Sequence, residues 1–152
     1  MNAAVVQAAR RWIGTPYVHQ ASMLGAGCDC LGLVRGIWRE VNGSEPEDVP
    51  AYSGDWSEMG QDEVLWKASQ RHLICKGLDE VCEGDVLLFR MRDQGVAKHM
   101  GIQASTGAEA SFIHAYAGHA VVETPLSVPW ARRIVARFAF PLPDPSEQEI
   151  LS

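Results

Sequence analysis

Cys30 is the residue whose position most suggests chemistry. It lies in the segment GCDCLGLV at 27–34, where a loop ends and an apolar helical pattern begins. A thiol at a helix N-terminus faces unpaired backbone N–H groups and a partial positive charge, which favour the thiolate that attacks a carbonyl. The position therefore suggests a nucleophile. The alternative is a small buried cysteine that starts a core helix.

A cysteine nucleophile needs a base to accept its proton and a third group to orient that base. Two of the five histidines, His99 and His114, fall in the predicted strands 99–104 and 111–116. Alternation along a strand puts Met100 and its even-numbered neighbours opposite His99. If the two strands are neighbours, one face of the sheet carries both imidazoles.

The remaining histidines and two of the four cysteines have weaker claims to chemistry. His72 belongs to a predicted helix face, and His119 to a predicted hairpin turn. His19 lies in the loop before Cys30 and could reach the same cleft. Cys75 and Cys82 are expected to be buried structural thiols, since the cysteine spacing does not resemble a disulfide framework.

Two amphipathic helices are predicted in the first third of the chain. Val5, Ala9, Trp12 and Ile13 follow a helical spacing that the Gly-Thr-Pro at 14–16 terminates. The residues at 17–27 have no sustained period and predict a loop that leads to Cys30. The second helix places Leu31, Val34, Trp38 and Val41 on one face and ends at the Asn-Gly pair 42–43.

The rest of the chain predicts a surface connection, a third helix and then strands. The connection is rich in acids and covers 44–56, and Ser57 is the predicted N-cap of the helix. Gly77 ends this helix, whose inner face holds Val64, Leu65, Ala68 and His72. Short alternating or apolar runs then predict strands at 85–91, 99–104, 111–116, 120–123 and 134–140.

Short connections such as 117–119 require antiparallel neighbours, so the predicted fold is α+β, with N-terminal helices packed on an antiparallel sheet. A length of 152 residues with 47% hydrophobic content suits one domain, which we place at 1–141. The polar residues 142–152 are expected to form a tail that could contact a partner.

Charge and hydropathy exclude several classes of protein. The net charge of −6 and the thin spread of 13 basic residues argue against a nucleic-acid partner. No apolar run approaches the roughly 20 residues that span a bilayer, which argues against membrane insertion. The first nine residues lack the basic and apolar regions of a signal peptide, so synthesis in the cytoplasm without one is expected.

Five motifs in order give the chain a family resemblance. It resembles the NlpC family of papain-like cysteine peptidases, and especially the branch found with phage tails and gene transfer agents. The resemblance runs over roughly residues 5 to 140 and rests on WIGTPY (12–17), GCDCLGLV (27–34), EGDVLLFR (83–90), HMGIQ (99–103) and FIHAYAGHAVVETPL (112–126).

The resemblance implies a role for each matching residue. Cys30 is the implied nucleophile, His99 the general base and then acid, and His114 the polar residue that orients the imidazole. Tyr17 would assist the oxyanion with its hydroxyl, together with the backbone N–H of Cys30. The alternative for Tyr17 is an aromatic side chain that only packs at the start of a loop.

Residues next to the nucleophile both follow and depart from the family pattern. Asp29 matches an acid that can hold the free amino group of a peptide substrate, although it could equally be a helix N-cap. Many members have Ser after the catalytic cysteine, where this chain has Leu31. The loop at 18–27 also lacks the common Gly-Gly pattern. A requirement for a free N-terminal L-Ala is therefore not carried over.

The implied activity is hydrolysis of an amide bond in the peptide stem of bacterial peptidoglycan, between γ-D-glutamate and diaminopimelate, through a thioester acyl-enzyme. No cofactor or metal is implied. Phage-like tail proteins are the implied partners, and the protein would act from a virion or tail at the periplasmic cell wall.

Three alternatives remain from the sequence. The chain could be a structural tail-tip component with weak or no hydrolase activity. Cys28, Cys30, His99 and His114 could instead hold zinc, although no CxxC spacing is present. Finally, Cys28 could form a strained disulfide with Cys30 and silence the enzyme, or simply pack in the core.

Overall fold

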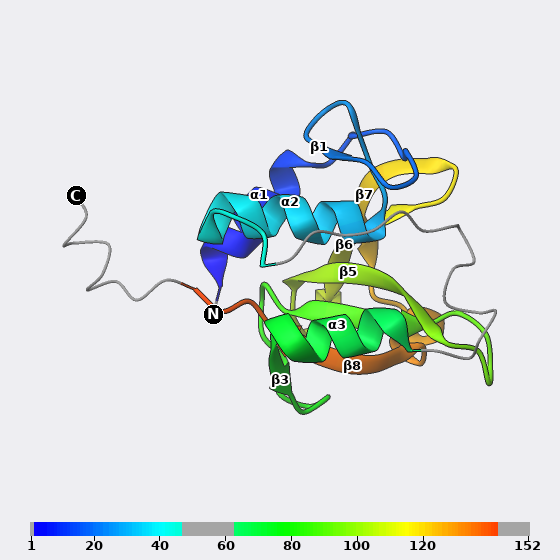
Figure 1. Ribbon diagram of the computed structural model, residues 1–152. Helices are drawn as coiled ribbons and strands as arrows, with labels where there is room; N and C mark the ends of the chain where they lie inside the picture. The colour runs from blue at the N-terminus through cyan, green and yellow to red at the C-terminus, as the bar shows by residue number, and fades with distance from the viewer. Residues whose placement is uncertain (1, 47–62, 143–152) are drawn as a thin grey trace.

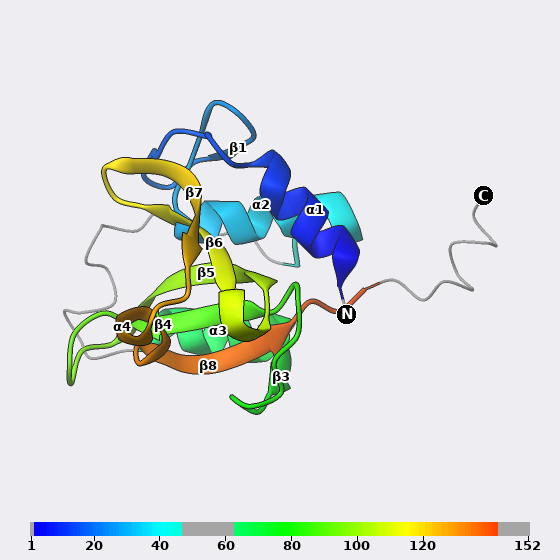
Figure 2. The ribbon, with the colours of Figure 1, turned by 180° about the vertical axis from the view of Figure 1, so that it is seen from behind.

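Helices cover one face of a single large sheet. The computed structural model describes residues 2–46 and 63–142. Helices α1 (Ala3–Arg11) and α2 (Cys30–Asn42) lie beside each other above the sheet, as Figures 1 and 2 show from opposite sides. Helix α3 (Val64–His72) adds buried Leu65 to the same core. Within the described ranges, no helix is both long and apolar enough to cross a membrane.

The sheet has six strands in the order β3-β8-β4-β5-β6-β7, and every neighbouring pair is antiparallel. This arrangement confirms the predicted α+β fold. Its strands are β3 (Ile74–Lys76), β4 (Val86–Arg90), β5 (Ala97–Ser105), β6 (Ser111–Tyr116), β7 (His119–Pro125) and β8 (Ile134–Ala139).

Strand β5 separates two apolar clusters. Met100, Ile102 and Ala104 point into the main core beneath the helices, as the alternation predicts. A smaller cluster of Leu87, Phe89 and Phe112 lies apart from that core. Phe89 is the register partner of His99, and their ring centroids are 5.5 Å apart, so His99 faces this smaller cluster.

Several short elements were not predicted. Strands β1 (Ser22–Met23) and β2 (Gly27–Cys28) form a small hairpin inside the segment that the sequence predicts as loop. A one-turn helix, α4 (Val128–Ala131), and a 3-10 turn at Gly107–Glu109 connect the strands. A period is not measurable over two to four residues, which is why pattern analysis misses them.

The prediction for the third helix is wrong at its C-terminal end. The helix ends at His72 rather than near Gly77, because residues Ile74–Lys76 form β3 and pair with β8. Cys75 is therefore exposed on an edge strand, not buried in the core as predicted. The predicted N-cap, Ser57, and most of the connection 44–56 lie outside the described residues.

A buried ion network ties β3, β4 and β8 together beneath the sheet edge. The Asp85 carboxylate accepts hydrogen bonds from Lys76 Nζ at 2.6 Å, Arg137 Nη1 at 2.8 Å and the backbone N–H of Cys82 at 2.8 Å. Arg137 also donates to Gln103 Oε1 on β5 at 3.0 Å. Two cations thus share one carboxylate, and these hydrogen bonds offset part of the desolvation penalty of burying the charges.

The first turn of α2 is pressed against the preceding loop at Gly32. A Cβ atom at this position would lie 1.9 Å from the backbone oxygen of Ala21, so only glycine fits. Ser22 Oγ also donates a hydrogen bond to the backbone oxygen of Gly32 at 2.6 Å. The close approach fixes where Cys30, two residues earlier, meets the sheet.

Replacing Gly32 with alanine should therefore destabilise the protein by about 1–3 kcal/mol, the usual cost of overpacking a rigid backbone contact. Urea denaturation followed by circular dichroism measures the change. Gly77→Ala is the matched control, because a Cβ atom there meets only the flexible carboxylates of Asp79 and Glu80. Equal stability losses in the two variants would contradict this explanation.

Candidate active site

Asp29 caps helix α2 and places Cys30 at the first helical position. One carboxylate oxygen of Asp29 accepts the N–H of Gly32 at 2.7 Å, and the other accepts the N–H of Gln20 at 2.8 Å. The Asp29 side chain is only 4% exposed. Of its two sequence interpretations, the N-cap is the one that this geometry displays.

The Cys30 thiol contacts the backbone of β5 at Lys98 and Met100, the residues on either side of His99. Its Sγ is 3.8 Å from the backbone oxygen of Lys98. The backbone N–H groups of Met100, Leu31 and Cys30 itself act on the same sulfur and favour its thiolate form. No hydrogen bond between Cys30 and the His99 ring is present in the described part of the chain.

His99 and His114 form a hydrogen-bonded pair across β5 and β6. His99 Nε2 lies 2.8 Å from His114 Nδ1, and His114 Nε2 lies 3.0 Å from Thr124 Oγ1 on β7. Both imidazoles are buried, with 6% and 2% exposure respectively. The two histidines thus share one face of the sheet, and the chain of contacts leaves His99 Nδ1 without a hydrogen-bond partner among the described residues.

Trp130 of α4 covers the histidine pair. Its ring centroid is 5.9 Å from that of His99 and 5.2 Å from that of His114. It also contacts Phe89 and Phe112 of the smaller apolar cluster. The indole therefore shields the imidazoles from water on this side.

A backbone bridge to Cys28 holds Tyr17 near Cys30. Residue 17 forms an isolated parallel β-bridge with Cys28, and its half-buried ring packs against the main core. Burial raises the pKa of Tyr17, and the charges of Cys30 and Asp29 raise it further. Its hydroxyl therefore stays protonated and can donate a hydrogen bond.

The protonation states differ from the thiolate that a helix N-terminus alone would favour. Burial, followed by the charge of Asp29, raises the pKa of Cys30 to about 12. Burial also lowers the pKa of His99 to about 3 and that of His114 to about 4. At neutral pH the resting site therefore holds a neutral thiol and two neutral imidazoles, because desolvation disfavours every charged form.

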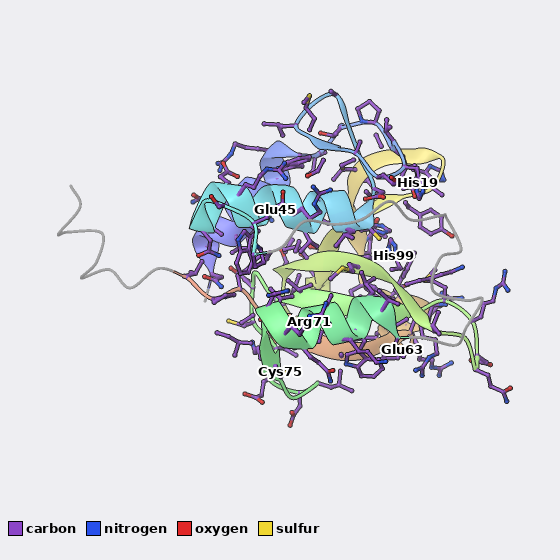
Figure 3. All side chains as sticks on the ribbon, in the orientation of Figure 1. His19, Glu45, Glu63, Arg71, Cys75 and His99 are labelled. Atoms are coloured by element: carbon purple, nitrogen blue, oxygen red, sulfur yellow. The ribbon has the colours of Figure 1, made fainter. Side chains whose placement is uncertain are left out.

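The other titratable residues of the sequence analysis are dispersed. His19 Nδ1 is 3.9 Å from Asp29 Oδ2, at the mouth of the site. His72 is in α3, and His119 begins β7, where its ring stacks on Tyr116. Figure 3 shows His19 near the top of the molecule, His99 below it at mid-height and Cys75 near the bottom.

The structure does not assemble the ligand set of the zinc alternative. The described residues contain no group of three or more His, Cys, Asp or Glu side chains placed to hold a metal ion. Cys28 is a fully buried free thiol in β2, and burial raises its pKa to about 12. Its packing role is the one that the structure displays, and all four cysteines are free.

Thr124 and Trp130 were not identified as candidate site residues from the sequence. Thr124 could have been found, since β6 and β7 form a hairpin and alternation places it on the face that holds Phe112, its register partner. Trp130 offered no such signal, because its one-turn helix lies outside any periodic pattern.

Alkylation should report these protonation states. With iodoacetamide at pH 7, exposed Cys75 should react first, and Cys30 should react only as the pH rises toward its raised pKa of about 12. Peptide mapping by mass spectrometry measures both sites, and Cys75→Ser isolates the slow phase. Rapid labelling of Cys30 at pH 6 would instead show a resting thiolate.

Acid should destabilise the fold through the buried histidines. Their pKa values of about 3 and 4 lie below the value near 6.5 of an unfolded chain, so the unfolded state binds protons first as the pH falls. The stabilisation is complete above pH 6.5 and is lost between pH 6.5 and about 3. The free energy of unfolding, measured in urea, should therefore decrease less steeply with acid in His99→Gln than in wild type. A wild-type slope in His99→Gln would refute the assignment.

Comparison with known proteins agrees with this architecture. The NlpC/p60 domain of the peptidoglycan hydrolase SagA is 23% identical with a TM-score of 0.58, over 92% of this chain and 99% of that one. An NlpC/P60 family protein from Bacillus cereus ATCC 10987 is 20% identical with a TM-score of 0.64, over 94% of this chain and 41% of that one. A lipoprotein-like NLP/P60 protein from Staphylococcus aureus subsp. aureus Mu50 is 16% identical with a TM-score of 0.58, over 90% and 40%. These likenesses establish the fold, and the chain spans about two fifths of the last two proteins.

Comparison with sequence families establishes more than the structural likeness does. No curated protein sequence matches the chain. The model of the NlpC/P60 family, however, matches residues 14–138, which is most of the chain and includes Cys30, His99 and His114. The chain therefore belongs to the NlpC/P60 family.

Proposed function

We propose that the protein is a cysteine peptidase that hydrolyses an amide bond in the peptide stem of bacterial peptidoglycan. The observation that carries the proposal is the 2.8 Å contact between His99 and His114, with Cys30 Sγ against the backbone on both sides of His99. Membership of the NlpC/P60 family supports it, as does the fold shared with SagA, which is described as a peptidoglycan hydrolase.

The histidine pair can select the tautomer that a base requires. If His114 Nε2–H donates to Thr124 Oγ1, then His114 Nδ1 is free to accept the Nε2–H of His99. His99 Nδ1 is then unprotonated and available as the general base. In this arrangement His114 and Thr124 orient the base, which is the role that the resemblance implies for His114.

Acylation follows from these positions. Rotation of the Cys30 side chain away from the Lys98 carbonyl brings the thiol to His99 Nδ1, which accepts its proton as Sγ attacks the substrate carbonyl carbon. The oxyanion receives hydrogen bonds from the backbone N–H of Cys30 and the hydroxyl of Tyr17. The C–N bond then breaks, the amine leaves with the proton from His99, and a thioester remains.

Deacylation reverses the roles of the same groups. His99 accepts a proton from water as the water oxygen attacks the thioester carbonyl carbon. The C–S bond breaks, Cys30 regains the proton, and the free carboxylic acid departs. Burial beneath Trp130 keeps the imidazole neutral between steps, so that its Nδ1 lone pair is unprotonated at neutral pH.

Asp29 contributes to this mechanism chiefly through position. Both of its oxygens already accept backbone N–H groups, and the buried carboxylate has little surface to offer a substrate amine. Contact with a free amino group, the role that the resemblance implies, would have to share these oxygens. A substrate without a free N-terminal L-Ala is therefore compatible with the site, as Leu31 also suggests.

The finer features of the proposal rest on the motif resemblance. They are the bond between γ-D-glutamate and diaminopimelate, an association with phage-like tail proteins, and action at the periplasmic wall. The alternative of a structural tail-tip component keeps the fold and predicts binding to tail proteins without turnover. Release of muropeptides distinguishes the two.

Purified sacculi provide the direct test. The wild-type protein should release muropeptides whose new termini, read by mass spectrometry, identify the bond that is cleaved. Cys30→Ala should abolish release, and His114→Ala should slow it by roughly 10²–10⁴, the usual contribution of an oriented acid–base group. Cys28→Ala is the matched cysteine control and should retain activity. Undiminished release by Cys30→Ala would refute the mechanism, and an inactive wild type would favour the structural alternative.

A further inference from the structure

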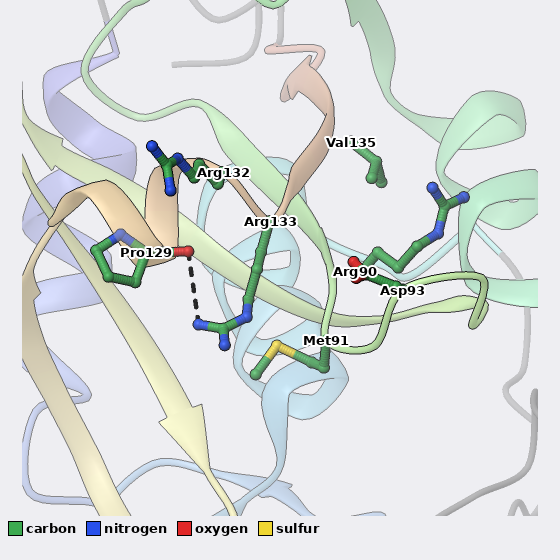
Figure 4. A pocket seen from close by; sticks show the side chains of 7 residues that line it. All are labelled: Arg90, Met91, Asp93, Pro129, Arg132, Arg133 and Val135. Atoms are coloured by element: carbon green, nitrogen blue, oxygen red, sulfur yellow. Dashed lines mark hydrogen bonds between the residues drawn. The ribbon is translucent and has the colours of Figure 1, made fainter.

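A hollow lies on the surface beside the short helix that carries Trp130. It has a volume of about 440 Å³ and is lined by the end of β4, by α4 and by the start of β8 (Figure 4). Of its lining residues, Arg133 lies 5.8 Å from the Trp130 ring centroid, and the same ring is 5.9 Å from that of His99. Arg133 and the proposed base therefore both lie near one indole.

The hollow is basic in a protein that is acidic overall. Arg90, Arg132 and Arg133 line it, with Asp93 as its one carboxylate, whereas the whole chain has a net charge of −6. Figure 4 shows Arg132 and Arg133 on one side and Arg90 on the other. The Arg90 guanidinium points away from the other two in this view, so an anion would meet positive charge from two directions once that side chain turns toward it.

These arginines differ from others in the described residues because they form no ion pair there. Salt bridges engage a different set: Arg10, Arg11, Arg35, Arg39 and Arg137. In the hollow, Arg133 reaches only the backbone oxygen of Pro129 at 3.5 Å. Arg90 Nε is buried without a hydrogen-bond partner, which is a costly state for a charged donor. An incoming anion would satisfy these donors.

We propose that Arg90, Arg132 and Arg133 bind a carboxylate of the peptide substrate. This inference rests on the proposed function and deepens it by naming a specificity subsite. A γ-linked glutamyl residue keeps its α-carboxylate free, and a diaminopimelate residue carries further carboxylate groups. Guanidinium groups bind carboxylates through paired, charge-assisted hydrogen bonds, so arginine suits this ligand.

The position fits a substrate that also reaches Cys30. Arg133 and His99 lie 5.8 and 5.9 Å from the centroid of the same indole, and an extended peptide advances about 3.3–3.6 Å per residue. A stem of three or four residues is therefore long enough to reach from Arg133 past the indole to His99. The subsite would hold the acidic end of the stem while Cys30 attacks.

Calorimetry on the inactive Cys30→Ser protein tests the subsite without turnover. The probes are a stem peptide with free carboxylates, the same peptide with these groups amidated, and inorganic phosphate. The acid peptide should bind roughly tenfold more tightly than the amide, or about 1.4 kcal/mol. Arg132→Gln combined with Arg133→Gln should remove this preference. The matched control, Arg10→Gln with Arg11→Gln, changes charge equally and should keep it.

Several results would overturn the proposal. They are equal binding of acid and amide peptides, no binding of either, or a preference that survives in the Arg132 and Arg133 double variant. Phosphate binding in the hollow without any acid preference would assign it to phosphate instead. Circular dichroism checks that the variants fold, and Arg133→Lys should restore part of the preference because it keeps the charge.

Activity on sacculi separates this inference from the proposed function. A wild-type protein that prefers the acid peptide but releases nothing would refute the peptidase and leave the subsite. Hydrolysis with no preference for the acid peptide would refute the subsite and leave the peptidase.

Discussion

The capping of α2 by Asp29 is the interaction on which the site depends. One carboxylate holds the first turn of the helix through Gly32 and the preceding loop through Gln20, so the two segments cannot move apart. The close contact between Gly32 and the Ala21 backbone then fixes the distance between the helix and the loop. As a result, Cys30 has a fixed position against β5. The same charge opposes ionisation of the neighbouring thiol, so the residue that positions Cys30 also raises its pKa.

Local signals made much of the fold predictable. The helix that begins at Cys30 combines an N-cap with apolar periodicity, and both signals can be recognised from neighbouring residues in the sequence. Its end at Gly43 follows from a positive φ of 86° that glycine adopts without strain. In contrast, β3 exists because β8, some sixty residues later in the chain, supplies its partner. A three-residue strand of this kind is decided by tertiary contact, which no local pattern records.

The candidate site was predictable to the extent that it follows strand alternation. His99 and His114 meet because the pleat and the register place them on one face. Their electrostatics could not be predicted, because desolvation depends on what covers a group in three dimensions. Trp130 comes from a single helical turn and covers the imidazoles, while burial of the Cys30 thiol outweighs the influence of the helix terminus on that thiol. Strand alternation therefore predicted that the two imidazoles share a face, but not their protonation.

The alternation of β5 has a consequence for how this protein can evolve. One register sends Met100 and Ile102 into the main core and His99 to the opposite face. Insertion or loss of a single residue within the strand would exchange the two sets, burying polar rings in the core while exposing its apolar side chains. The same strand register therefore determines both the packing of the core and the position of His99. An added residue in a connection, such as residues 91–96 between β4 and β5, would leave this register intact.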